Sequence, residues 1–162
     1  MYKRQVFLLL PVLVLSACGG GDDKRPAPDE SAAAPSIGIN MKSPVEDPLC
    51  YFVADTGSPI PVTGPDARYV FVTEMSGSGY RGHAALDGVV TALEEVEAGF
   101  GAGMETRRYV NDASGVELEV ILLDEVETEA SLRYKGSVRV IYPVEGEAVK
   151  FYGECRYGED AE

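Results

Sequence analysis

The chain lacks tryptophan altogether and has a single histidine and only three cysteines among its 162 residues. It is also poor in positive charge, with 14 lysines and arginines against 27 aspartates and glutamates, a formal net charge of −13 at pH 7. Such an acidic chain is a poor ligand for nucleic acid or for an anionic membrane surface. We therefore expect no nucleic-acid partner. The charge fits either plain solubility or a basic protein partner.

Motifs for nucleotide and redox chemistry are missing as well. There is no Walker A motif, no G-x-G-x-x-G and no C-x-x-C. The segment Gly77-Ser78-Gly79 lacks the spacing of a nucleophile elbow. Two acidic clusters, at residues 94–97 and 124–129, lack the ligand spacing of a calcium loop, so solvated acidic faces are the simpler interpretation. The sequence predicts no metal site, no cofactor and no enzymatic activity.

His83 is the one residue that could support an enzymatic reading. As a general base it would need a neighbouring nucleophile, and none follows it in a recognisable motif. A hydrolase using His83 is therefore an alternative that we rank below a structural role for this side chain.

The N-terminus has a basic and then an apolar part. Lys3 and Arg4 precede the run VFLLLPVLVLSAC, which ends at Cys18. The run is shorter than the ~20 residues that span a bilayer, and it contains a proline. These features are typical of a signal peptide. The segment Leu15-Ser16-Ala17-Cys18 resembles the lipobox of bacterial lipoproteins at every position.

The resemblance to bacterial lipoproteins implies the chemistry of Cys18. Its sulfur would carry diacylglycerol, and cleavage before Cys18 would free an amino group for acylation, with palmitate among the expected chains. Several acyl chains anchor a protein firmly where one is marginal. Gly19, in place of the aspartate of inner-membrane lipoproteins, implies the outer membrane and a domain facing the periplasm. The alternative is an ordinary secretory signal cleaved after Ala17, with no lipid.

The cysteine count fits this assignment. With Cys18 lipidated, Cys50 and Cys155 remain, and an even pair in an exported domain predicts a disulfide. Two free buried thiols are the alternative.

Composition divides the chain into four parts. Residues 1–17 form the signal peptide, and residues 18–47 carry the lipidated cysteine and a tether rich in glycine, proline and alanine, which we expect to be disordered. Residues 48–158 form one β-rich domain, and residues 159–162 are an acidic tail. No second apolar run follows the signal, so we expect no transmembrane helix.

The β-rich domain shows successive strand patterns. Val116, Leu118, Val120 and Leu122 alternate with Glu117 and Glu119, the period of a half-buried strand. Similar patterns predict strands at residues 49–53, 67–73, 104–111, 132–142 and 149–155. Gly136 suggests a bulge or bend, and residues 124–129 suggest an acidic loop. Arg133, Lys135 and Arg139 are expected to pair with Glu117 and Glu119 across strands.

Residues 80–98 are ambiguous. Asp87-Gly88 between apolar runs predicts a two-residue hairpin, whereas Val89, Val90, Leu93 and Val96 also have helical spacing. We favour the hairpin and allow at most one short helix, at residues 88–98. The expected fold is mainly β, an antiparallel sandwich or small barrel of about seven to eight strands. Cys50 in the first strand and Cys155 in the last would close it.

The second half of the domain is similar to small exported β-domains of unknown function, on the segments Tyr134-Lys135-Gly136 and Tyr152-Gly153-Glu154-Cys155. This similarity implies no activity. The leading expectation is a lipid-anchored, non-enzymatic envelope protein that acts as a binding or structural module. An inhibitor of a basic envelope-attacking enzyme such as lysozyme is the alternative. The sequence leaves the oligomeric state open.

Overall fold

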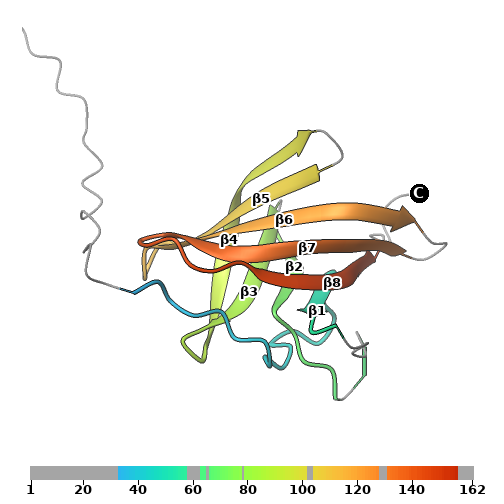
Figure 1. Cartoon of the computed structure of the whole chain (residues 1–162), viewed down its shortest axis with the longest axis horizontal. Helices are drawn as coiled ribbons and strands as arrows, with labels where there is room; N and C mark the ends of the chain where they lie inside the picture. The colour runs from blue at the N-terminus through green and yellow to red at the C-terminus, as the bar shows by residue number, and fades with distance from the viewer. Residues whose placement is uncertain are drawn as a thin grey trace, which may run out of the picture.

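A closed barrel of eight antiparallel strands makes up the protein (Figure 1). The computed structural model describes residues 33–57, 63–64, 66–77, 79–101, 104–127 and 131–156. The strands are β1 (Cys50–Ala54), β2 (Phe71–Ser76), β3 (Gly79–Leu86), β4 (Val89–Gly101), β5 (Met104–Asn111), β6 (Val116–Glu127), β7 (Ser131–Tyr142) and β8 (Val149–Arg156). Each strand pairs with the next in sequence, and β1 pairs with β8. The mainly β prediction is confirmed, with a barrel as the architecture and no helix among the described residues.

The ambiguous segment at residues 80–98 forms the β3–β4 hairpin. Asp87 and Gly88 are its two turn residues, both with positive φ, at 49° and 81°. This is the backbone that a tight hairpin turn requires, and aspartate and glycine adopt it at low cost. The turn chemistry therefore outweighs the helical spacing of the valines in β4.

The barrel interior is filled by alternate side chains of every strand. The buried core comprises Phe52, Ala54, Val70, Phe71, Ala84, Leu86, Leu93, Tyr109, Val116, Leu118, Val120, Leu122, Val138, Val140 and Phe151. The rings of Phe52 and Phe151 lie with their centroids 4.5 Å apart, and Phe71 meets Tyr109 edge-on at 5.1 Å. Large aromatic rings thus occupy the centre of this small barrel.

Gly136 faces this core from the middle of β7. A Cβ at this position would lie 1.9 Å from the carbonyl oxygen of Ile121 and 2.9 Å from the ring of Phe151. The glycine is therefore required for close approach of β6 and of the phenylalanine ring. The strand has no bulge at Gly136, where a bulge or bend was expected. The register shifts of the β6–β7 pair lie at other residues.

A second apolar cluster lies outside the barrel, under the segment that leads into β1. It consists of Met41, Tyr51, Val53, Ala67, Tyr69, Val72 and Ala85. Met41 exchanges backbone hydrogen bonds with Tyr69, and the N–H of Gly38 donates to the carbonyl of Ala85 at 2.8 Å. Residues 33–47 therefore pack on the barrel, which corrects the expectation that the tether extends to residue 47. Residues 18–32 lie outside the described part of the chain.

Two other expectations are corrected. Residues 67–70 precede β2 instead of belonging to it, and within them Tyr69 pairs with Met41. Residues 124–127, expected in an acidic loop, continue β6.

The outer ion pairs are confirmed only in part. Arg139 binds Glu119 at 2.8 Å, as expected. Arg133 instead pairs with Glu154 on β8, and Glu117 pairs with Arg108 on β5.

The two ends of the barrel differ. At one end, the Asp87 end, lie the β3–β4 turn, the β5–β6 turn and the β7–β8 connection, and the N-terminal segment reaches the barrel there (Figure 1, left). At the other, the disulfide end, lie the last residues of β6 and β8. The described part of the chain has no helix long and apolar enough to cross a membrane.

Candidate binding face at the disulfide end

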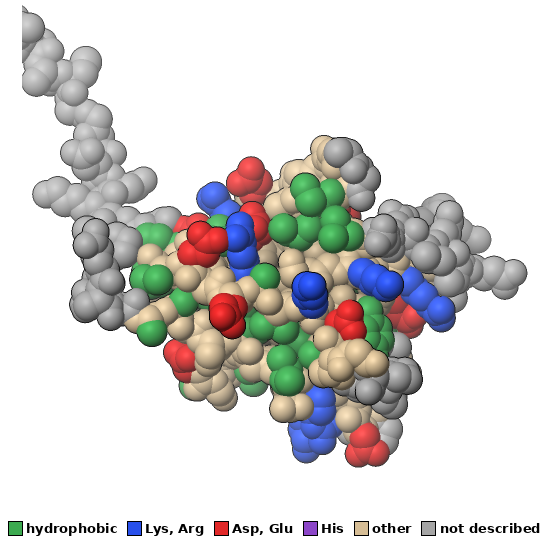
Figure 2. Space-filling model, in the orientation of Figure 1, with side chains coloured by type: hydrophobic (Ala, Val, Ile, Leu, Met, Phe, Trp, Pro, Cys, Tyr) green, Lys and Arg blue, Asp and Glu red, His purple; other side chains and the backbone are tan. Residues whose placement is uncertain are grey.

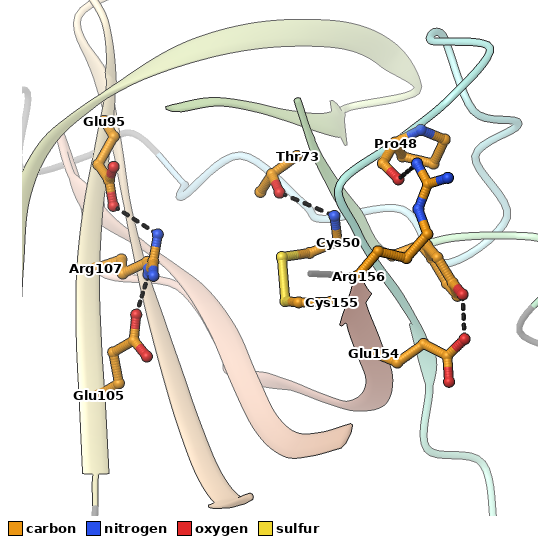
Figure 3. Close-up of a disulfide and its surroundings, with 10 residues drawn as sticks. Pro48, Cys50, Thr73, Glu95, Glu105, Arg107, Glu154, Cys155 and Arg156 are labelled. Carbon is orange, nitrogen blue, oxygen red and sulfur yellow. Dashed lines mark hydrogen bonds and ion pairs between the residues drawn. A yellow bond between two sulfur atoms is a disulfide. The ribbon is translucent and has the colours of Figure 1, made fainter. Parts of the chain in front are cut away.

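The disulfide end is organised by the bond between Cys50 and Cys155, which confirms the predicted pairing. The two cysteines are register partners on β1 and β8, and both side chains border the core. The hydroxyl of Thr73 on β2 accepts a hydrogen bond from the backbone N–H of Cys50 at 3.2 Å (Figure 3). The disulfide therefore joins the first and last strands inside the barrel, near its rim.

Across the barrel from the disulfide, a guanidinium bridges two carboxylates (Figure 3). Arg107 contacts Glu95 on β4 at 3.1 Å and binds Glu105 on its own strand. Its guanidinium carbon lies 5.0 Å from the centre of the Tyr80 ring, within the range of a cation–π contact. The side chains of Arg107, Glu95 and Glu105 are mostly shielded from water, so each charge is stabilised mainly by its partners in the cluster.

Burial dominates the electrostatics of this cluster. It raises the pKa of Glu95, and the attraction of Arg107 offsets only part of that shift. Burial likewise raises the pKa of Tyr109, which lies below Arg107 on β5. In this cluster, one cation is shared by two carboxylates.

Little free space remains beneath the rim. A cavity beside the disulfide is lined by Cys50, Phe52, Phe71, Thr73, Arg107, Tyr109, Val120 and Leu122, and it has room for about one water molecule. Ligand cavities in proteins are far larger, roughly 300–1,000 Å³. In the described part of the chain, the barrel interior is therefore a packed core, and recognition falls to the surface.

The β4–β5 hairpin projects beyond the rest of this rim (Figure 1, top). β3 pairs with β4 only as far as Arg81 opposite Glu94, whereas β5 follows β4 to Gly101 opposite Met104. A β-bulge between Glu95 and Glu97 marks the point where β3 and β4 separate. Bulges often end pairing and bend a strand in this way.

Exposed apolar side chains gather around the same end. They are Met75, Val96, Phe100, Met104 and Leu123, and Phe100 is 76% exposed. Figure 2 shows hydrophobic side chains grouped on one face above β6. Concentrated exposed apolar surface is typical of interaction sites. The disulfide end thus combines exposed apolar side chains with carboxylates that are paired with arginines.

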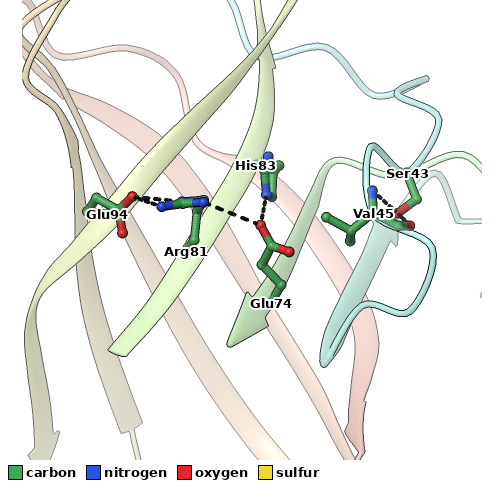
Figure 4. A network of polar contacts seen from close by, with 6 residues as sticks. All are labelled: Ser43, Val45, Glu74, Arg81, His83 and Glu94. Carbon is green, nitrogen blue, oxygen red and sulfur yellow. Dashed lines mark hydrogen bonds and ion pairs between the residues drawn. The ribbon is translucent and has the colours of Figure 1, made fainter. Parts of the chain in front are cut away.

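His83 lies elsewhere, on the outer face of β3. Its Nε2 is 2.9 Å from Oε1 of Glu74, and the same carboxylate lies 3.9 Å from Arg81 (Figure 4). His83 is buried, and among the described residues no serine, threonine or cysteine hydrogen-bonds to its ring. This arrangement favours a structural hydrogen bond between His83 and Glu74 over a catalytic base.

The structure brings together two of the three predicted site residues, Cys50 and Cys155. Cys18 lies outside the described residues. Within the described residues, no group of three or more histidine, cysteine, aspartate or glutamate side chains could hold a metal ion.

Sequence reasoning missed the contact between Glu95 and Arg107. A signal was present, because Arg107 is two residues from the inward Tyr109 and Glu95 is two residues from the inward Leu93. Residues two apart in a strand share a face.

Comparison with known proteins finds no relative. No family model matches the chain, and no curated protein and no solved structure matches it either.

Proposed function

We propose that this protein is a lipid-anchored envelope protein whose barrel is a non-enzymatic binding module for a basic protein. The observation that carries the proposal is the disulfide end, where exposed apolar side chains lie above a filled core in a chain whose formal net charge is −13. A filled barrel offers surface rather than a pocket for recognition. An acidic surface attracts cationic proteins and speeds their association.

The position of the N-terminal segment supports this assignment. Ser36 is fixed to Asp87 at the end of the barrel opposite the disulfide. A lipid on Cys18 would be separated from Ala33 by a chain that reaches at most ~50 Å when extended. An anchor joined to the Asp87 end leaves the disulfide end free to meet a partner.

The anchor is tested by membrane fractionation of the wild type and of the Cys18→Ala variant. We expect the wild type in the outer-membrane fraction with acyl chains detected by mass spectrometry. The variant should be released as an uncleaved or differently cleaved soluble form. Normal membrane retention of the variant would refute lipidation at Cys18.

Binding is tested with c-type lysozyme as a basic, envelope-attacking probe. We expect the purified protein to bind lysozyme at low salt and to lose affinity as salt screens the charges. Inhibition of lysozyme is the narrower second candidate, favoured by the same apolar end and by the net charge of −13. A turbidity assay of bacterial lysis separates the two. Undiminished lysis with saturating protein bound would remove inhibition, and absence of binding at low salt would remove the basic-partner proposal.

A further inference from the structure

The β4–β5 hairpin leaves a row of backbone groups on β4 without a strand neighbour. Residues 96–101 of β4 pair with β5 on one side, and within the described chain no strand pairs with them on the other. In an antiparallel strand, every second residue directs its N–H and C=O to each side. An open strand edge of this kind is a template for another extended chain.

This edge has little of the protection that β-proteins usually give an exposed edge. Its sequence is Val-Glu-Ala-Gly-Phe-Gly, with no proline or lysine and one charged residue, Glu97. Proline and lysine are the residues that most often block edge pairing. The bulge falls at the first residue of this segment, Val96, where β4 separates from β3, and residues 97–101 pair regularly with β5. The edge is therefore open to a further strand.

We propose that residues 96–101 of β4 bind an extended segment of a cationic protein by strand addition, at the disulfide end of the barrel. This inference rests on the proposed basic partner and states where and how it docks. Main-chain hydrogen bonds would supply the affinity, and alternate side chains would supply the specificity.

The chemistry of the two faces of β4 specifies the partner. Ala98 and Phe100 are opposite Arg107 and Glu105 in the register, so they share the face that overlooks the barrel mouth. Phe100 is largely exposed there and offers an anchor for an apolar side chain. Glu97 and Gly99 lie on the opposite face of the strand. An added strand with alternating apolar and basic residues fits both faces.

Charge selects a cationic segment over a second copy of this chain. Glu94 and Glu97 pair with Arg81 and Arg108, so these two pairs carry no net charge. The neighbouring cluster holds one arginine, Arg107, for two carboxylates, and the whole chain has a formal net charge of −13. Two copies of so acidic a chain repel each other, which disfavours the dimer and favours a cationic segment.

The test uses two peptides of equal length and charge, one of alternating lysine and valine and one of alternating lysine and proline. The proline peptide keeps the charge but loses the N–H groups that valine would contribute to pairing. We expect the full chain to bind the lysine–valine peptide at least tenfold more tightly. Hydrogen exchange should slow at the amides of residues 96–101 when that peptide binds.

Matched variants locate the contact. Phe100→Ser should weaken binding of the lysine–valine peptide about tenfold, whereas Val89→Ser, another exposed position on β4 at the Asp87 end, should leave it unchanged. Glu97→Gln should weaken binding of the lysine–valine peptide more than the control variant Glu147→Gln, whose site lies in the β7–β8 connection. Circular dichroism of each variant checks that the barrel is folded.

The outcomes separate this inference from the proposed function. Equal binding of both peptides without protection at residues 96–101 would overturn strand addition and leave a basic partner in place. Absence of binding to both peptides and to lysozyme would overturn both proposals. A third outcome is protection of the amides of residues 96–101 from exchange in the absence of peptide, with protection that increases with protein concentration. That result would identify a second copy of the chain as the occupant and overturn the cationic segment.

Discussion

Cys50 and Cys155 are direct neighbours across the β1–β8 pair, with Cα atoms 4.0 Å apart, although 105 positions separate them in sequence. The barrel is closed by the same pair of strands. One covalent bond therefore holds the seam between the first and the last strand of the domain.

Removal of this bond is predicted to destabilise the barrel strongly. A crosslink that closes a loop of this length restricts the unfolded chain by about 4–5 kcal/mol in the chain-entropy account. The double variant Cys50→Ser, Cys155→Ser should lose roughly that much free energy of unfolding, as measured by urea denaturation. Wild type treated with a reductant should show the same loss. A change below about 1 kcal/mol in both samples would contradict this role.

Gly136→Ala is predicted to be strongly destabilising. The added methyl group would collide with the backbone of Ile121, which cannot move without breaking the β6–β7 pairing. We expect a loss of about 3 kcal/mol in thermal or urea unfolding, at the upper end for overpacking. Gly79→Ala is the matched control, because nothing lies within 4 Å of the added Cβ and its φ is not positive. Similar losses in both variants would show that steric crowding is not the cause.

The hairpin, the interior and the disulfide could be predicted from the sequence because each depends on local or pairwise signals. The pair Asp87-Gly88 specifies the β3–β4 turn. The alternation of apolar and charged residues in β6 shows which of its faces is buried, and an even cysteine pair in an exported domain predicts the disulfide. The packing of residues 33–47 could not be predicted this way. That segment has no alternation typical of a strand, and its partners, among them Tyr69, Ala85 and Asp87, come close to it only in the folded barrel.

The candidate site was less predictable than the fold for a related reason. Arg107 and Arg108 lie on opposite faces of their strand, but which of these faces is inside depends on the register with β4 and β6. The open edge of β4 likewise exists because β4 extends beyond its last pairing with β3. Such differences arise from pairing between strands and are not encoded in the residues of β4 alone.

The contact between Ser36 and Asp87 is predicted to hold the N-terminal segment and to weaken in acid. Hydrogen bonds from the backbone and hydroxyl of Ser36 hold the pKa of Asp87 below its ordinary value of 3.8. Because the folded pKa is depressed, this stabilisation is complete above the ordinary pKa. It is lost as pH falls through the folded one. Asp87→Asn keeps the turn backbone but removes the charge.

The measurement is the hydrogen-exchange protection factor of the Gly38 and Met41 amides, both of which bond to the barrel. At neutral pH, we expect lower protection in Asp87→Asn than in the wild type, and the difference should shrink in acid. Asp112→Asn, in the β5–β6 turn at the same end, should match the wild type. Unchanged protection in Asp87→Asn would show that the apolar cluster alone holds the segment.

Arg107→Met is predicted to destabilise the disulfide end in a pH-dependent manner. Loss of the guanidinium leaves two shielded carboxylates, Glu95 and Glu105, without their shared cation. Removal of one member of a buried ion cluster costs about 3 kcal/mol or more at neutral pH. Burial already raises the pKa of Glu95, and loss of Arg107 would raise it further. The folded variant then binds more protons than the unfolded chain, so its stability falls as pH rises above the ordinary pKa of a glutamate.

Urea denaturation at several pH values provides the measurement, and Arg133→Met provides the control. Arg133 lies on the outer face of β7 and is 65% exposed, and its contact with Glu154 is 3.5 Å long. An exposed cation of this kind contributes about 0–1 kcal/mol. The stability gap between the two variants should therefore narrow toward acid, where Glu95 is protonated and no longer needs a cation. A gap that is constant with pH would mean that Arg107 acts through its packing on Tyr80 instead of through its charge.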